Sequence, residues 1–349
     1  MLNKIFTLAW AIMCGAGAQE LGIPLPWVLG PMFGIGFFTF AELAGSLPSV
    51  GRQGGQITIG VALGLYFTQS VIAQVSQLAI WMILGAVFSL ALTMLFARFF
   101  QRFAGVSGAT AMYCSAIGAA SDMATQAQKA GADGAAVASS HAVRVMIVVT
   151  VIPLIATFMG AEAIDAALAL KGMAPIIERE PLAVVVGCGI ALAWIAGRLG
   201  LPNPWVLAPL AVAAIYAAMG NETRLPEAVV NGGSLLIGWN LGQYMTREFF
   251  KNSPRVVLAA ALMTVGMLLV SLGFAALISA WVGLPLVTAI VATSPGGIAE
   301  MAITAKVLGL GAPVVTAFHF IRLLSVIIFI KPLSDLMIKK GWLRSSLDI

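Results

Sequence analysis

The chain has 349 residues, of which 60% are hydrophobic and only 9% are charged, and its formal net charge is +5. Soluble domains carry roughly 25% charged residues, so this composition excludes an ordinary soluble globular protein. The mean hydropathy is +1.00, and several apolar runs approach the ~20 residues that cross a bilayer as a helix. The basic residues are scattered between these runs, which indicates loop topology rather than nucleic-acid binding. These features predict an all-α, polytopic membrane protein whose main partner is the lipid bilayer.

The sequence contains an internal duplication. Residues 21–32 (LGIPLPWVLGPM) and 199–210 (LGLPNPWVLAPL) are identical at eight of twelve positions, and the offset between Trp27 and Trp205 is 205 − 27 = 178 residues. The offset continues without a gap, and it aligns the chain's two histidines, His141 and His319. We predict two membrane repeats, 1–160 and 181–340, joined by a polar linker at 161–180 and followed by a cytoplasmic tail at 341–349.

Each repeat contains six apolar segments. They cover 4–19, 27–45, 54–74, 77–98, 107–130 and 134–159 in the first repeat, and 181–197, 205–219, 232–249, 256–280, 284–307 and 312–337 in the second. The first segment also resembles a secretory signal, with a lysine, an apolar stretch and small residues. It aligns with internal residues 181–198, so we expect a retained helix rather than a cleaved signal.

The fifth segment of each repeat differs from the others. It contains SAIGAASD (115–122) in the first repeat and TSPGGIAE (293–300) in the second. Pro295, Gly296 and Gly297 remove an amide donor and lower helix propensity at one place. A broken or re-entrant helix inside the protein tolerates this sequence, because neighbouring helices and cavity water satisfy the freed backbone groups.

Loop charges predict how the repeats are oriented. Arg98 and Arg102 follow the fourth segment of the first repeat, whereas the matching loop 281–283 is uncharged. Three basic residues flank the loop after the third segment of the second repeat, whereas the matching loop 69–77 has none; they are Arg247, Lys251 and Arg255. Basic residues mark cytoplasmic loops. Both sets and both termini fall in the cytoplasm if the fifth segment re-enters, so that each repeat crosses five times and the two repeats are inverted. Another segment could be the re-entrant one.

A set of ionisable residues recurs inside the apolar segments of both repeats. The set is Asp122, His141, Arg144, Glu300, His319 and Arg322. Such groups cost about 2.5–3.5 kcal/mol on insertion scales and mark functional sites. One interpretation is a midplane site in which the arginines bind an anionic group and an acid exchanges a proton or holds a cation. The alternative is a structural brace, in which each acid pairs with the arginine of its own repeat. The two roles can coexist.

Other polar residues complete the candidate solute- or ion-binding set. They are Ser115, Ser294, Asn240, Gln243, Tyr66 and Tyr244. The third segments also carry Gly60-x-x-x-Gly64 and Gly238-x-x-x-Gly242, which favour close helix packing. Two histidines in separate halves and three cysteines without metal-ligand spacing give no metal site. We therefore expect no catalytic residue, no cofactor and no metal.

The paired LGxPxPWVLxP segments, the paired IGxxLGxYxT segments and the SPGGIAEMAITAKVLG…HFIRLL stretch resemble the AbrB family of bacterial inner-membrane proteins, over nearly the whole chain. This family is distinct from the soluble DNA-binding regulator that shares its name. The resemblance implies a multi-pass protein of the bacterial inner membrane with a duplicated domain. Family members are labelled either as regulators of AidB expression or as ammonia monooxygenases.

These observations lead to three hypotheses for function. The first is a secondary transporter or exporter of a small solute, anionic or amphipathic, and not an enzyme. The second is a membrane sensor that affects gene expression indirectly, because the chain has no basic DNA-reading module. The third, a membrane monooxygenase, requires a cluster of His or carboxylate ligands, which two histidines and scattered acids do not supply. A homo-oligomer is compatible with all three.

Overall fold

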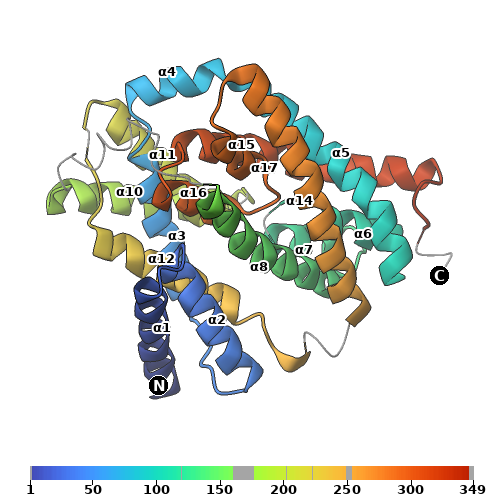
Figure 1. The fold of residues 1–349 in the computed structure, drawn as a ribbon, viewed down its shortest axis with the longest axis horizontal. Coiled ribbons are helices and arrows are strands. Elements are labelled where there is room, and N and C mark those ends of the chain that lie inside the picture. Colours follow the sequence, from blue (N-terminus) through green and yellow to red (C-terminus); the bar gives the residue numbers. More distant parts are fainter. Residues whose placement is uncertain are drawn as a thin grey trace. The chain divides into compact units, whose positions relative to one another are not determined.

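The computed structural model describes residues 2–118, 120–159, 177–201, 203–221, 223–248 and 254–345. Within these ranges every helix or strand assigned is an α-helix, as the sequence predicts (Figure 1). Most of the predicted linker at 161–180 and the last four residues of the predicted tail lie outside the described residues.

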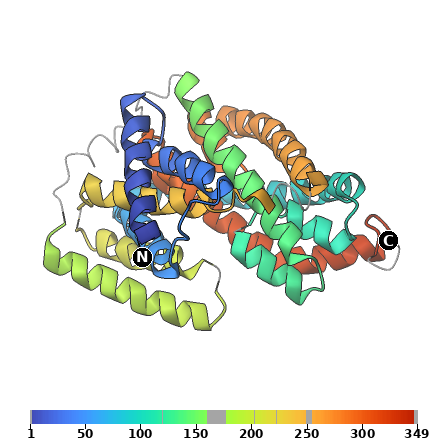
Figure 2. The same cartoon turned by 90° about the horizontal axis from the view of Figure 1, so that it is seen from below.

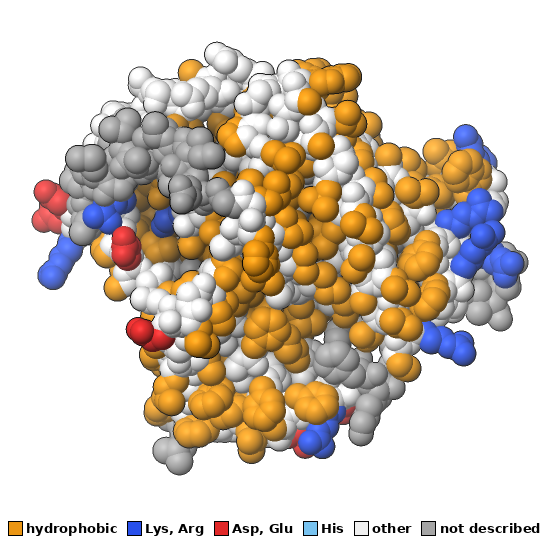
Figure 3. All heavy atoms as spheres, viewed as in Figure 1, with side chains coloured by type: hydrophobic (Ala, Val, Ile, Leu, Met, Phe, Trp, Pro, Cys, Tyr) orange, Lys and Arg blue, Asp and Glu red, His pale blue; other side chains and the backbone are white. Residues whose placement is uncertain are grey.

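Five helices are long and apolar enough to cross a membrane. They are α5 (Ala79–Ala104), α8 (Gly134–Phe158), α10 (Arg179–Arg198), α14 (Pro254–Val282) and α17 (Ala312–Lys339). Hydrophobic side chains also cover much of the face drawn in Figure 3. These features fit the predicted multi-pass membrane protein. By contrast, α2 (Pro26–Phe40) and α11 (Pro204–Ala218) have only 15 residues each, about 22 Å of helix, so five crossings per repeat stays a prediction.

The fifth segment is broken in both repeats, as predicted. In the first repeat α6 (Gly108–Ser115) ends before α7 (Ala120–Lys129), and in the second α15 (Leu286–Thr293) ends before α16 (Ile298–Val307). The breaks fall at Ile117-Gly118 and at Pro295-Gly296-Gly297, where the sequence disfavours a continuous helix.

The third segment of the first repeat is also broken, and its prediction as one continuous segment at 54–74 was wrong. It forms α3 (Ser49–Gly64) and α4 (Gln69–Gln77), which are bent by 88°. Tight turns close the end of α3, because the amide of Tyr66 donates to Leu63 O and the amide of Phe67 donates to Gly64 O. The Thr68 carbonyl then accepts from the amide of Ile72 and starts α4 in a new direction.

The chain forms two compact units, and each unit contains parts of both sequence repeats. Unit 1 comprises 1–77, 153–248 and 299–314, and unit 2 comprises 78–152, 249–298 and 315–349. The repeats therefore describe the history of the sequence, whereas the units describe which segments pack together.

In unit 1 the second and third segments of the two repeats pack on each other in exchange. Helix α3 packs on α11, and α12 (Glu227–Gly242) packs on α2. A Cβ on Gly60 would collide with Val206 O, and a Cβ on Gly238 would collide with Val28 O. These two contacts are the same contact in repeat coordinates. The close-packing interpretation of the glycine pairs therefore agrees with the structure.

The two Pro-Trp segments start their helices in the same way. Pro26 and Pro204 occupy the first turns of α2 and α11, where the missing amide costs nothing. The preceding residues, Leu25 and Asn203, both adopt the left-handed conformation, with φ of 53° and 46°. Figure 2 shows α10 beside α11, and α1 (Leu2–Glu20) contacts α2 in the equivalent way.

In unit 2 the equivalent helices α5 and α14 pack antiparallel (Figure 1). The rings of Phe88 and Phe274 stack with centroids 3.9 Å apart, and those of Trp81 and Trp281 meet edge to face at 6.0 Å. Toward the other end, a Cβ on Gly266 would meet the ring of Phe96. The offset of 178 residues converts the Phe88–Phe274 pair into the Gly266–Phe96 pair, so this packing is reciprocal.

Removing a close glycine contact tests the exchanged packing of unit 1. Gly60→Ala and Gly238→Ala should each destabilise the protein by about 1–3 kcal/mol, because a methyl group must displace the backbone of α11 or α2. The measurement is the thermal unfolding midpoint in detergent. Gly187→Ala on α10 is the matched control, since no atom lies within 4 Å of its added Cβ, and it should be neutral or slightly stabilising. Unchanged midpoints for both glycine variants would contradict the packing.

Candidate functional site

The end of α6 leaves backbone carbonyls without helical partners. The last intrahelical bond runs from the amide of Ala116 to Met112 O at 3.1 Å. The carbonyls that follow must find donors elsewhere, since unsatisfied buried backbone groups cost free energy comparable to a lost hydrogen bond. Tyr113, Ala116 and Ile117 are all buried, so bulk water does not supply those donors.

Helix α8 supplies them from one face. His141 Nε2 donates to Tyr113 O at 2.9 Å. Arg144 Nη1 donates to Ala116 O at 2.6 Å, and Nη2 donates to Gly118 O at 3.1 Å. The two side chains are three residues apart, which places them on the same side of the helix. They therefore cap the end of α6 and hold the break between α6 and α7.

The second repeat forms the same arrangement between α15 and α17. His319 Nε2 donates to Val291 O at 2.9 Å. Arg322 Nη1 donates to Ser294 O at 2.5 Å, and Nη2 donates to Gly296 O. Each acceptor lies 178 residues after its counterpart, so the duplication preserves the donors and also the acceptors.

The hydrogen bonds fix the protonation of both histidines. Nε2 must carry a proton, because its partner is a carbonyl oxygen. Nδ1 must accept, because Arg144 Nη2 donates to His141 Nδ1 at 3.1 Å and Arg322 Nη2 donates to His319 Nδ1 at 2.7 Å. Both imidazoles are therefore neutral. They orient the arginines, and this arrangement gives them no role as proton carriers.

The two guanidinium groups are buried cations. Arg144 is 1% exposed and Arg322 is 5% exposed. Both belong to unit 2, close enough for the charge of Arg144 to act on Arg322. Helix C-terminal ends favour cations, which accounts for part of this burial. Arg322 Nε is also buried and has no hydrogen-bond partner in the described part of the chain, so one donor remains available.

The candidate serines lie at the same two helix ends. Ser115 is the last residue of α6, and its hydroxyl donates to Ala111 O at 2.9 Å. Ser294 follows α15; its hydroxyl donates to Val291 O at 2.9 Å and its carbonyl accepts from Arg322. Both hydroxyl groups therefore serve the local backbone, and the Ser294 carbonyl is part of the arginine site.

The two acids lie in the first turns of the helices that follow the breaks. Asp122 is in α7, but its side chain lies outside the described residues. Glu300 is in α16 and is half-buried, and its carbonyl accepts from the Thr304 hydroxyl at 2.8 Å. The described partners of both arginines are backbone carbonyls and histidine nitrogens. Bracing by acid–arginine pairs stays a prediction.

The remaining candidates belong to unit 1. Gln243 Nε2 donates to Asn240 Oδ1 at 2.9 Å, and Gln243 Oε1 accepts from the amide of Leu47 at 3.2 Å. These two residues thus tie the end of α12 to the loop before α3. Tyr66 and Tyr244 are half-buried at equivalent positions after α3 and α12.

Sequence reasoning missed Lys306 and the carbonyl acceptors. Lys306 Nζ lies 5.7 Å from the centroid of the Tyr66 ring, within the distance of a cation–π contact. Its counterpart in the first repeat is Gln128, so this charge is present in only one half. Among the described residues, no group of three or more His, Cys, Asp or Glu could hold a metal ion.

The long apolar helices and the two capped breaks define a helical protein of membrane type. The family profile described as "Transition state regulatory protein AbrB" matches residues 27–338, and the chain belongs to this AbrB family. The uncharacterized protein YhjN of Bacillus subtilis (strain 168) is 26% identical, and the match covers 97% of this chain and 94% of the relative. A protein of Escherichia coli (strain K12) named as a candidate regulator AbrB is 25% identical, with 92% and 94% covered.

Replacing either arginine by lysine tests the capping role. Arg144→Lys and Arg322→Lys should each destabilise the protein by about 2–4 kcal/mol, because an ammonium group cannot reach two carbonyls and a histidine at once and charged hydrogen bonds contribute about 1.5–3 kcal/mol each. Thermal unfolding in detergent measures the loss. Arg198→Lys is the control; this exposed arginine lies 3.6 Å from the Trp194 ring centroid, and its loss should stay below ~1 kcal/mol.

The same measurement distinguishes the two kinds of brace. If acid–arginine pairing held the breaks, Asp122→Asn and Glu300→Gln would destabilise the protein as much as loss of the arginine. If the carbonyl contacts hold them, the acid variants should keep most of the stability while the lysine variants lose it. Near-native stability of Arg144→Lys and Arg322→Lys would contradict the capping role.

Proposed function

We propose that the protein is a secondary transporter or exporter of a small anionic solute. The observation that carries the proposal is the buried Arg322, which caps a broken helix and keeps one N–H without a described partner. A second buried cation, Arg144, acts on it in the same unit. Two such charges favour a negatively charged ligand, because buried charges require compensation.

The broken helices support transport over simple binding. Transporters commonly bind their substrates where discontinuous helices of two repeats meet near the bilayer midplane. Asp122 and Glu300 follow the breaks directly. Carboxylates inside a membrane segment are costly and commonly relay protons. In this mechanism the arginines bind the solute anion and an acid carries the coupling proton.

We further infer that the two repeats have inverted topology. The antiparallel, reciprocal packing of α5 and α14 supports this, because equivalent helices of an inverted pair run in opposite directions across the membrane. The loop charges agree, since basic residues follow α5 at one end and precede α14 at the corresponding end. The arrangement places both termini in the cytoplasm of a bacterial cell.

A regulatory role is the second candidate. It is favoured by the name of the Escherichia coli relative, a candidate regulator. In that case the same buried arginines would sense a solute without moving it, and a cytoplasmic protein would bind the basic loops.

Transport assays separate these functions. Purified protein in proteoliposomes is screened with small carboxylates and amphipathic anions, first for ligand-dependent thermal stabilisation and then for uptake under a proton gradient. Glu300→Gln and Asp122→Asn should lower gradient-driven uptake by at least about tenfold while the stabilisation persists, because general acid–base groups contribute about 10²–10⁴-fold. Arg198→Gln is the unaffected control.

Two outcomes would contradict transport. In one, no solute moves and both acid variants still complement a deletion strain. In the other, a solute stabilises the protein without being moved and a cytoplasmic protein cross-links to the basic loops. The second outcome would establish the regulatory alternative.

Cysteine labelling tests the inverted topology. After Cys14, Cys114 and Cys188 are replaced by Ser, single cysteines are introduced at Arg102, Arg255, Gln77 and Ala280. Arg102→Cys and Arg255→Cys should react only with reagent on the cytoplasmic side, and Gln77→Cys and Ala280→Cys only from outside. The offset pairs Arg102 with Ala280 and Gln77 with Arg255. Labelling of either pair from the same side would contradict inversion.

A further inference from the structure

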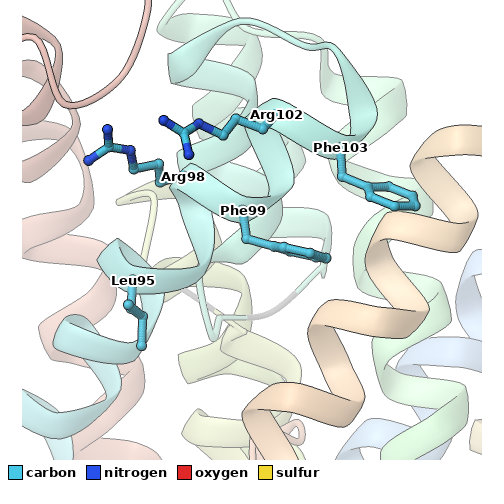
Figure 4. Close-up of a pocket in the computed structure, with 5 residues that line it drawn as sticks. All are labelled: Leu95, Arg98, Phe99, Arg102 and Phe103. Atoms are coloured by element: carbon cyan, nitrogen blue, oxygen red, sulfur yellow. The ribbon is translucent and has the colours of Figure 1, made fainter.

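Two arginines lie beside exposed aromatic residues at the end of α5. Leu95, Arg98, Phe99, Arg102 and Phe103 line a surface pocket of about 410 Å³. Figure 4 shows both guanidinium groups extending to one side of the helix and both phenylalanine rings pointing to the other. The rings of Phe99 and Phe103 stack at 5.7 Å. The pocket thus offers charge and apolar surface together.

Three further cations are held at the same end of unit 2. Lys339 and Lys340 end α17, and Arg344 follows them. The backbone of Arg344 is fixed to α5, because its carbonyl accepts from Gln101 Nε2 at 3.0 Å and its amide donates to Gln101 Oε1 at 3.0 Å. We call Arg98, Arg102, Lys339, Lys340 and Arg344 the basic end.

The basic end carries little compensating charge. Among the described residues none of its five members forms a salt bridge. Figure 3 shows Lys and Arg side chains gathered at this side of the molecule, without acidic side chains beside them in the coloured part of that view. Like charges four residues apart on a helix repel each other, so the pair Arg98 and Arg102 gains from a bound anion.

The length of α5 places this charge at the headgroups of a bilayer. Exposed apolar side chains run along the helix, including Ile83 at 53%, Val87 at 57% and Leu95 at 64%. Arg98 follows Ala79 by nineteen residues, a rise of about 29 Å, and the hydrocarbon core is about 30 Å thick. A helix that crosses the core from its first residue therefore brings Arg98 and Arg102 to the phosphate level.

We propose that the basic end is a binding site for anionic phospholipid, with Arg98 and Arg102 contacting the phosphodiester and Phe99 and Phe103 contacting the glycerol and acyl region. A lipid matches both features of the pocket, because basic clusters at a membrane surface attract acidic headgroups and aromatic rings favour the interface. A soluble acidic protein would match the charge alone. The proposal does not depend on the transport mechanism.

Lipid titration of the full chain tests the site. Purified protein in detergent is titrated with dioleoyl phosphatidylglycerol or with dioleoyl phosphatidylcholine, and native mass spectrometry counts the bound lipid. Phosphatidylglycerol should bind in preference. Each arginine removed should weaken its binding roughly fivefold, so that R98Q/R102Q binds roughly 25-fold more weakly, with no change for phosphatidylcholine.

Control variants separate charge from general damage. R98K/R102K keeps both charges and should retain most of the binding. R198Q removes one exposed arginine at the end of α10 and should leave binding unchanged. The single variant R102Q should show the fivefold loss if the double variant proves unstable. Inorganic phosphate at equal concentration should not displace the lipid, since it lacks the acyl chains that contact Phe99 and Phe103.

Three results would overturn the site. The first is equal binding of the two lipids by the unaltered protein. The second is unchanged phosphatidylglycerol binding by both R102Q and R98Q/R102Q. The third is displacement of the lipid by phosphate, or a protein partner that requires these arginines while lipid binding does not.

Discussion

The capping of broken helices by a buried arginine and histidine is the constraint on which unit 2 depends. A helix that stops inside an apolar environment exposes carbonyls that no solvent can satisfy. Here the donors come from the following helix, α8 or α17, through His141 and Arg144 or His319 and Arg322. The guanidinium group suits this task, because its planar fork donates to two carbonyls and a histidine nitrogen at once. The break is thus a defined structure rather than a loose loop.

The duplication makes these constraints reciprocal. In unit 1 a glycine of one repeat admits the backbone of the other, at Gly60 against Val206 and at Gly238 against Val28. In unit 2 the aromatic contacts of α5 and α14 exchange in the same way. A sequence change in one repeat must therefore be accommodated by the other repeat. This coupling explains why the glycines and the Pro-Trp segments recur with the same spacing.

The sequence predicted the helical class, the segments and the two breaks, because composition and repeat spacing report them directly. It also singled out His141, Arg144 and their counterparts. It could not give their partners, because a backbone carbonyl is present at every position and carries no letter of its own. The bend after Gly64 was missed for a similar reason: α3 and α4 form one apolar pattern, and local turn bonds near Tyr66 decide the direction.

The two repeats are equal in their braces and unequal in what surrounds them. Pro295 and Gly296 stand in the second break where Ile117 and Gly118 stand in the first, and proline removes a donor that the first repeat keeps. The second repeat also has Lys306 in place of Gln128 and Glu300 in place of Asp122. Structural bracing alone gives no reason for these differences, since the hydrogen bonds of the two arginines are equivalent. A protein that handles a solute asymmetrically, with one repeat carrying more of the charge, does give a reason. The asymmetry therefore favours a functional role for the second break in addition to its structural one.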